Sequence, residues 1–228
     1  MENLKESILQ YLQDHPPALE LFEELLHAGD VYLIGGILRE YRDKGYIQEL
    51  RDADFVIKVT DRKRWNDLLE KYQPRKNRFN GFKLICSGLL VDIWELKETW
   101  AYREGVIKCD PEEYVKYLPC TVFLNIDAII YDLKEDVWYD EIYREALKTG
   151  LIDIVLEKNP YVLLNIVRAM VLRRKYKMKY SDSLCKLIGC ERNRCVDFGK
   201  QLLDVQQDRY GKIVLSENEI KQELKLTE

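Results

Sequence analysis

Residues 31–57 read VYLIGGILREYRDKGYIQELRDADFVI, and this stretch decides the fold. Its first six residues form an apolar run that ends in two glycines, a pattern typical of a strand covered on both faces. ILREYRDKG then predicts a helix that ends at Gly45. DADFVIKV, which begins at residue 52, alternates and is rich in β-branched residues, so it predicts a second strand. A strand, a glycine turn, a helix and another strand therefore follow one another closely.

The neighbouring segments extend this pattern into a small sheet. Apolar residues at three- and four-residue steps predict helices at 2–14 and 17–28. After the second strand, WNDLLEKY predicts a helix, and FKLICSG with LLVDIWEL predicts a hairpin that turns at Ser87 and Gly88. The order of elements favours an α+β fold, with a small mixed β-sheet and flanking helices over about residues 29–135.

The remainder of the chain is helical in pattern. From about residue 138, four segments predict helices: YDEIYREALKTG, PYVLLNIVRAMVLRRKYKMKY, SDSLCKLIG and ERNRCVDFGKQLLDVQQDRYG. The expected stops are Gly150, Gly189 and Gly211. We therefore expect N-terminal helices at 1–28 that pack on a domain at 29–137, followed by a helical domain at 138–228.

Composition limits the classes of function. The chain has 228 residues, with 36 basic against 40 acidic side chains and a net charge of −4, so any polyanion must bind through a local feature. Two local basic runs exist, at 74–78 and 173–179. Six cysteines without a C-x-x-C pair and only two histidines disfavour a structural zinc site. With neither a long apolar run nor a leader pattern, we expect a soluble cytoplasmic protein without a membrane partner.

Two aspartates one residue apart indicate a candidate metal site. Alternation along a strand points Asp52 and Asp54 to the same face, where their charges repel unless a divalent cation lies between them. Mg²⁺ suits such a pair because it takes oxygen ligands and accepts substrate phosphates as further ligands. The turn at Gly35 and Gly36 lets the backbone approach a phosphate. Asp92, in an otherwise apolar strand, is a candidate third carboxylate for a two-metal arrangement or an ordinary acid on a half-exposed strand.

These stretches resemble a known family. VYLIGGILRE and RDADFVI are similar to the head-domain signature of the class II nucleotidyltransferases, the poly(A) polymerases and tRNA CCA-adding enzymes of bacterial type, in which a strand leads into GG-x-x-R-D and then D-x-D. VDIWELKETWAYR resembles the family's third acidic strand. TVFLNIDAIIYDL resembles the strand and helix written R-R-D-F-T-x-N-A-L-x-Y-D, and the segment from GLIDIVL to RRKYKM resembles the opening of the helical neck. The resemblance covers most of residues 30–180.

The resemblance implies a set of site residues. Metal ions, Mg²⁺ or Mn²⁺, would bind the carboxylates of Asp52, Asp54 and, as a third ligand, Asp92. Nucleotide-binding residues would be Gly35, Gly36, Arg39 and Arg168. The two glycines would bend around the triphosphate, Arg39 would support that loop, and Arg168 in IVRAM would face either the nucleotide or the interface between head and neck.

The implied activity is transfer of a nucleoside monophosphate from a nucleoside triphosphate to a hydroxyl acceptor, with release of pyrophosphate. The acceptor would be an RNA 3′ end, a small molecule or a protein side chain. Residues 121–125 read TVFLN where the family has R-R-D-F-T, so a catalytically impaired nucleotide-binding or interaction module with the same fold is the alternative. A third possibility is an unrelated α/β domain with Asp52 and Asp54 as surface acids. The sequence does not indicate a stable protein partner.

Overall fold

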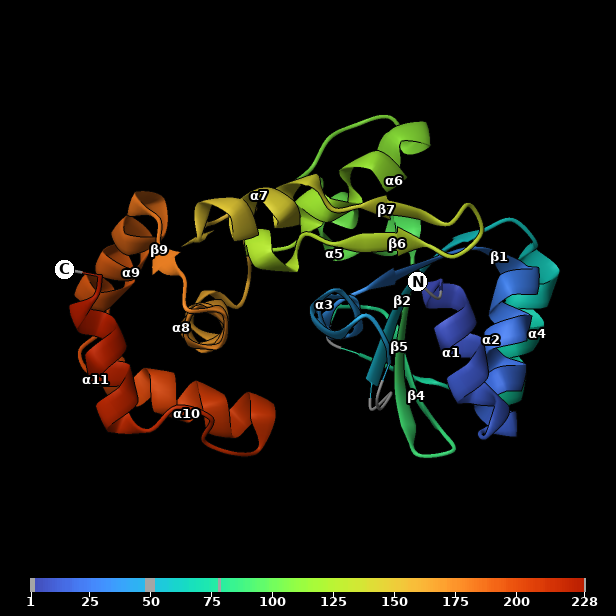
Figure 1. The fold of residues 1–228 in the computed structure, drawn as a ribbon, viewed down its shortest axis with the longest axis horizontal. Coiled ribbons are helices and arrows are strands. Elements are labelled where there is room, and N and C mark those ends of the chain that lie inside the picture. Colours follow the sequence, from blue (N-terminus) through green and yellow to red (C-terminus); the bar gives the residue numbers. More distant parts are fainter. Residues whose placement is uncertain (1–2, 48–51, 78, 228) are drawn as a thin grey trace. The chain divides into compact units, whose positions relative to one another are not determined.

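The computed structural model describes residues 3–47, 52–77 and 79–227 (Figure 1). Contacts divide the chain into two compact units. The sheet unit comprises Met1–Thr121 and Ile129–Asp140, and the helical unit comprises Val122–Ala128 and Glu141–Glu228. The domain boundaries expected from the sequence stay predictions, and each unit is described by itself below.

The sheet unit is built on a mixed sheet. Within the described residues seven strands pair in the order β3-β4-β5-β2-β1-β6-β7. Their bounds are Gly29–Ile34 (β1), Asp52–Val59 (β2), Arg75–Lys76 (β3), Phe82–Cys86 (β4), Leu89–Glu95 (β5), Ile130–Asp132 (β6) and Val137–Tyr139 (β7). β2 and β5 are parallel, whereas the other neighbouring pairs of this sheet are antiparallel. The expected α+β class with a mixed sheet is confirmed.

Helices of the sheet unit begin and end at local signals. The helices are Leu4–Gln13 (α1), Pro16–Ala28 (α2), Gly36–Lys44 (α3), Arg62–Tyr72 (α4), Trp100–Arg103 (α5) and Tyr114–Tyr117 (α6), with short 3₁₀ turns at Leu96–Glu98 (η1), Pro111–Glu113 (η2) and Leu118–Thr121 (η3). The Asp61 side chain accepts from the backbone N–H of Arg64 and caps α4. Gly45 ends α3 in the left-handed conformation, as its sequence predicts.

One face of the sheet packs against α2 and α4, and α1 packs on α2 (Figure 1). The Phe22 ring of α2 lies 6.0 Å from the Phe55 ring of β2, centroid to centroid. Trp65 of α4 is fully buried and meets the Phe82 ring edge to face at 5.6 Å. This face therefore holds the larger apolar core of the unit.

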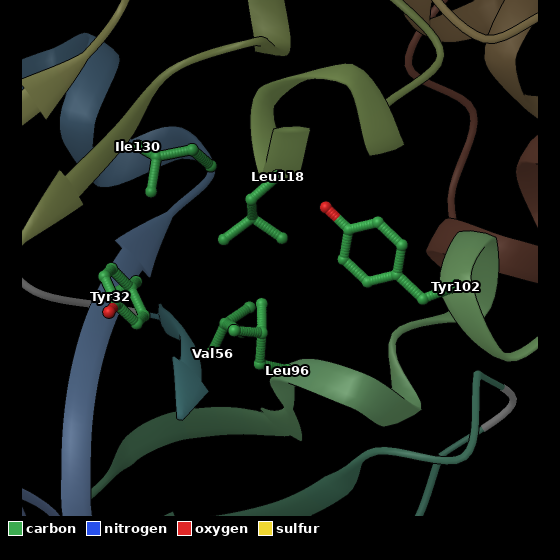
Figure 2. Packing of buried hydrophobic residues seen from close by; sticks show 6 residues of the cluster. All are labelled: Tyr32, Val56, Leu96, Tyr102, Leu118 and Ile130. Atoms are coloured by element: carbon green, nitrogen blue, oxygen red, sulfur yellow. The ribbon is translucent and has the colours of Figure 1, made fainter. Parts of the chain in front are cut away.

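The opposite face of the sheet carries a smaller core (Figure 2). Its buried members are Tyr32, Val56, Leu96, Tyr102, Leu118 and Ile130. Three of them come from neighbouring strands and three from the segment that follows β5. That segment covers only part of the face, so the same strands can present polar side chains beyond the cluster.

A charged network fixes the end of β5 to the start of α4. The Glu95 carboxylate accepts two hydrogen bonds from the Arg62 guanidinium, at 3.0 and 2.9 Å, and one from the Trp65 indole N–H at 2.8 Å. Burial alone would raise the pKa of Glu95, but the bonds from Arg62 and then Trp65 outweigh it and hold this pKa below its usual value.

Glu95→Gln should therefore make the free energy of unfolding less dependent on pH in the acidic range. The depressed pKa of Glu95 contributes stability above the unfolded pKa, about 4.3, and this contribution is lost as the pH falls through the folded value. We expect the urea midpoint of the wild type to fall more steeply between pH 7 and about pH 3.5 than that of the variant. The exposed Glu70→Gln on α4 is the control, and equal slopes in wild type and Glu95→Gln would contradict the assignment.

The helical unit follows its predicted helices except around residue 189. Its elements are Asn125–Asp127 (η4), Glu141–Thr149 (α7), Leu151–Ile152 (β8), Val162–Tyr176 (α8), Lys179–Tyr180 (β9), Asp182–Arg194 (α9), Phe198–Tyr210 (α10) and Glu217–Lys225 (α11). The expected stop at Gly189 is wrong, because α9 continues through it to Arg194; a single interior glycine costs a helix only about 1 kcal/mol. The chain breaks instead before Asp197, whose side chain caps α10.

Residues 122–128 belong to the helical unit although β6 follows them directly. The Asn125 side chain donates to the carbonyl of Leu151 at 2.9 Å and accepts from the N–H of Asp153 at 3.0 Å. The segment that resembles the family's strand and helix forms the 3₁₀ turn η4 and then the strand β6. Across the described residues, no helix combines the length and apolar character needed to span a membrane.

Candidate metal and nucleotide site

The strand register brings the three predicted carboxylates to one face. In the parallel pair β2–β5, Asp54 stands directly beside Asp92, and in the antiparallel pair β1–β2 it stands beside Ile34. Paired positions on neighbouring strands lie about 4.8 Å apart and share a face. Asp52, two residues before Asp54, points to this face as well. Asp54 thus lies at the centre of the acidic group.

Along the strands, the side chains on this face change from buried and apolar to acidic and more exposed. Tyr32, Val56 and Trp94 form a row that packs into the small core. One step further along β2, Asp54 and its row are half-buried. Asp52, the first residue of β2, is exposed beside Leu90. The carboxylates therefore lie where the apolar cover ends, with Asp54 and Asp92 half-buried and Asp52 exposed.

The glycine turn lies against one of these carboxylates. Gly35 has φ +86° and ψ −152°, a conformation that only glycine adopts readily. A Cβ added at Gly35 would lie 2.5 Å from Oδ2 of Asp54, so glycine is required for two separate reasons. α3 begins at Gly36, and its first backbone N–H groups and helix dipole are suited to an anion.

Arg39 lies next to the same turn. Its side chain is buried, with 6% of its surface exposed. A Cβ at Gly36 would lie 3.7 Å from an Nη atom of Arg39, so the guanidinium is next to the turn. The structure therefore brings Gly35, Gly36, Arg39 and Asp54 together within the sheet unit.

Asp92 has partners that the sequence did not reveal. Its Oδ1 accepts a hydrogen bond from the Asn77 side chain at 2.9 Å, and its Oδ2 lies 3.1 Å from the Lys83 ammonium. Within residues 3–47, 52–77 and 79–227, no group of three or more Asp, Glu, His or Cys side chains has an arrangement suited to a metal ion. The predicted role of Asp92 as third metal ligand stays a prediction.

Arg168 lies in the helical unit, where its guanidinium is held by a carboxylate. Nε and one Nη of Arg168 donate to the two carboxylate oxygens of Asp127 at 2.6 and 2.8 Å. The fork is bidentate, the geometry in which arginine binds a carboxylate most strongly. Asp127 stands where the family pattern has asparagine. No local pattern indicates that it pairs with Arg168, which lies 41 positions away along the chain.

The donor set fits a magnesium-type ion. Asp52 and Asp54 offer hard carboxylate oxygens on an open face, and Mg²⁺ prefers such ligands together with water and phosphate oxygens. The Lys83 ammonium beside Asp92 is a stand-in cation, because it balances negative charge on the same face. Asp52 and Asp54 are therefore the residues best placed to hold the ion.

Replacing Gly35 should lower the free energy of unfolding. Gly35→Ala places a side chain in a region open only to glycine and against Asp54, so we expect a loss of about 3 kcal/mol in the free energy of unfolding. Gly45→Ala is the matched control: its φ is +78°, but the added Cβ would meet nothing within 4 Å, so the loss should be about 1 kcal/mol. Urea unfolding of both variants measures the difference, and equal losses would contradict the contact with Asp54.

Comparisons with known proteins establish the class of fold. No protein-family model and no curated protein matches the chain. Among solved structures, an apo form of a CCA-adding enzyme aligns with a TM-score of 0.61 at 18% identity, over 95% of this chain and 53% of the other. A complex of a CCA-adding enzyme with CTP gives a TM-score of 0.58 at 17% identity, with 96% and 53% coverage. The Thermotoga maritima CCA-adding enzyme in complex with tRNA gives 0.56 at 18% identity, with 92% and 51% coverage.

The chain therefore has the fold of the CCA-adding enzymes, and the resemblance noted in the sequence is confirmed as a likeness of fold. The chain spans about half the length of these solved structures.

Proposed function

We propose that the chain is a metal-dependent nucleotidyltransferase. It transfers a nucleoside monophosphate from a nucleoside triphosphate to a hydroxyl acceptor and releases pyrophosphate. One observation carries the proposal: the carboxylate of Asp54 lies against Gly35, so the candidate metal ligands adjoin the turn that begins α3. A metal-bound triphosphate needs these two features next to each other.

Each part of this arrangement has a task. Asp52 and Asp54 bind Mg²⁺ or Mn²⁺, which supplies charge neutralisation for the phosphates when bound. The turn at Gly35 and Gly36 and the first amides of α3 hold phosphate oxygens. Arg39, whose guanidinium lies next to Gly36, supports the turn. The acceptor oxygen forms a bond to the α-phosphorus, the bond to pyrophosphate breaks, and catalysis consists mainly of positioning and charge stabilisation.

The fold supports a nucleotide and an RNA as the reacting partners. Solved structures with this fold include a CCA-adding enzyme bound to CTP and another bound to tRNA. An RNA 3′ end is therefore the first acceptor to test, with hydroxyl-bearing small molecules as the second. The triphosphate is the substrate, and the divalent ion is the cofactor.

The second candidate function is nucleotide binding without transfer. The Asp127 carboxylate accepts both hydrogen bonds from the Arg168 guanidinium. The family resemblance assigned Arg168 to the nucleotide or to the interface between head and neck. Asn77 donates a hydrogen bond to one carboxylate oxygen of Asp92, and Lys83 forms an ion pair with the other. If these groups are needed for chemistry, the chain would bind a metal nucleotide and release no pyrophosphate.

Pyrophosphate release separates the two functions. The chain is incubated with each of the four ribonucleoside triphosphates and Mg²⁺ or Mn²⁺, with and without bulk cellular RNA or a panel of hydroxyl-bearing small molecules. We expect metal-dependent release that increases with an acceptor. Saturable nucleotide binding in equilibrium dialysis with no release under any of these conditions would support the binding module instead.

A further inference from the structure

We propose that Arg75 and Lys83 form an anion subsite that binds a phosphodiester of an RNA acceptor, next to the hydroxyl that reacts. The inference rests on the proposed function and deepens it, because it names side chains that hold the acceptor. Neither residue is among the metal ligands or the nucleotide-binding residues given above. Of the acceptors that the sequence leaves open, the subsite selects the RNA 3′ end.

Strand register places both cations on the face of the metal site. β4 and β5 are antiparallel, and Lys83 stands directly opposite Asp92. β3 and β4 are antiparallel as well, and Arg75 stands directly opposite Lys83. On its other side, Asp92 stands beside Asp54. Because paired positions share a face, these four side chains form one row across β3, β4, β5 and β2, with a length of three strand spacings or about 14 Å.

The neighbouring cation of β3 lies on the opposite face of the sheet. Lys76 pairs with Phe82, and its ammonium lies 3.7 Å from the centroid of the Phe82 ring. That ring meets Trp65 of α4, on the face that α2 and α4 cover. Alternation along the strand therefore brings Arg75 to the face of the metal site and takes Lys76 away from it.

Both cations of the subsite have donors for a phosphate. The Lys83 ammonium lies 3.1 Å from Oδ2 of Asp92, and the Lys83 side chain is 45% exposed. An ammonium has three N–H donors, so Lys83 can keep this ion pair and donate to a phosphate as well. Arg75 is exposed, and no described residue forms an ion pair with its guanidinium. A guanidinium fork matches the oxygens of a phosphate.

The two cations lie on the side from which the acceptor approaches. In phosphoryl transfer the attacking and leaving oxygens are roughly in line, with the phosphorus between them. The proposed function holds the triphosphate at the turn after β1, so pyrophosphate leaves toward that turn. Gly35 in this turn lies against Asp54, and from Asp54 the row runs through β5 and β4 to β3, away from β1. The acceptor hydroxyl therefore approaches along the half of the face that carries the cations.

The charges along the row favour an acceptor with an anion next to its hydroxyl. The 3′-terminal hydroxyl of an RNA lies one nucleotide from a phosphodiester, whereas a neutral small molecule or a serine side chain has no such anion. The chain has a net charge of −4, so a local group of cations must attract a polyanion. The carboxylates at the other end of the row repel the same backbone, which confines the phosphodiester to β3 and β4.

Binding of a short single-stranded RNA, labelled with fluorescein at its 5′ end, tests the subsite. Fluorescence anisotropy measures the affinity in about 50 to 200 mM salt, at a fixed Mg²⁺ concentration and with a non-hydrolysable α,β-methylene triphosphate present. Arg75→Gln and Lys83→Gln should each weaken binding by at least about fivefold at the lowest salt. Each should also reduce the slope of log affinity against log salt by about 0.7, because one phosphate contact fewer releases fewer counterions.

Lys76→Gln is the matched control. It makes the same change of charge one residue further along β3, but on the opposite face. Its affinity should stay within about twofold of the wild type, because salt screens a cation that does not contact the RNA. Its salt slope should equal that of the wild type.

Two further variants separate a phosphate contact from an indirect effect of charge. Lys83→Gln leaves the carboxylate of Asp92 without its counter-charge, which by itself repels RNA. The double variant Lys83→Gln, Asp92→Asn restores the net charge of the face, and it should keep the reduced salt slope of Lys83→Gln. Lys83→Arg retains the cation and should keep the wild-type slope. Arg75 and Lys83 are exposed, so their single variants should keep the wild-type circular dichroism spectrum.

Three results would overturn the inference: unchanged salt slopes in Arg75→Gln and Lys83→Gln, a wild-type slope in the double variant, or no RNA binding by the wild type. Failure of the proposed function has a different outcome. If the chain binds the RNA with the predicted pattern but releases no pyrophosphate with any acceptor, the subsite holds and the transfer reaction fails. If it releases pyrophosphate while the variants bind RNA as the wild type does, the transferase holds and the subsite fails.

Discussion

Asp54→Asn should lower the rate of nucleotidyl transfer by at least about 10³-fold. A catalytic metal ion contributes several kilocalories per mole of charge stabilisation, and about 4 kcal/mol corresponds to that factor. Asp54 lies at the centre of the acidic row and against Gly35, so its loss removes a metal ligand and changes the charge next to the triphosphate. Asp52→Asn should have an effect of the same order, because it removes the partner ligand on the same face.

Pyrophosphate release under saturating triphosphate measures this loss. Asp67→Asn, at an exposed position of α4 on the other side of the sheet, makes the same chemical change away from the site and should keep wild-type activity. Each variant should keep the wild-type circular dichroism spectrum. Wild-type turnover in both Asp52→Asn and Asp54→Asn would contradict the metal site.

Glu223→Ala should cost about 3 kcal/mol of stability in the helical unit. The Glu223 carboxylate is 1% exposed and accepts from Nε and Nη2 of Arg173 on α8 at 2.5 and 2.6 Å. The Tyr180 hydroxyl donates to it at 2.5 Å. Burial raises the pKa of Tyr180, and the bond to Glu223 adds to the rise, so the hydroxyl stays protonated. Removing the buried carboxylate leaves the half-buried Arg173 guanidinium without its counter-charge, and breaking a buried ion pair typically costs about 3–5 kcal/mol.

Far-UV circular dichroism during urea unfolding measures this effect, because the unit is largely helical. All four tryptophans lie in the sheet unit, so indole fluorescence follows the other unit separately. Glu217→Ala removes an exposed i,i+4 partner of Lys221 on the same helix and should cost less than about 0.5 kcal/mol. A Glu223→Ala midpoint equal to that of Glu217→Ala would contradict the buried network.

Local signals were sufficient for much of the sheet unit. The glycine turn and the hairpin depend on backbone conformations that few residues adopt, and Ser87 and Gly88 both have positive φ, at 50° and 83°. The alternation of DADFVIKV placed Asp52 and Asp54 on one face without any knowledge of neighbouring strands. Such features are encoded within a few consecutive residues.

Cross-strand and long-range contacts were not predictable in the same way. The parallel pairing of β2 with β5, which places Asp92 beside Asp54, depends on register set by the whole sheet. The antiparallel register of β4 and β5 pairs Lys83 with Asp92, and the contact from Asn77 to Asp92 depends on the turn that holds Asn77. Gly189 was misjudged because a glycine carries a weak stop signal that packing can override.

The most direct test is a crystal structure of the chain with Mn²⁺ and a non-hydrolysable α,β-methylene triphosphate, using the anomalous signal of manganese. We predict one strong anomalous peak at about 2.1 Å from carboxylate oxygens of both Asp52 and Asp54, with the triphosphate at the turn that begins α3. A nucleotide bound elsewhere, or a metal peak remote from these two carboxylates, would contradict the assignment of this face as the nucleotidyltransferase site.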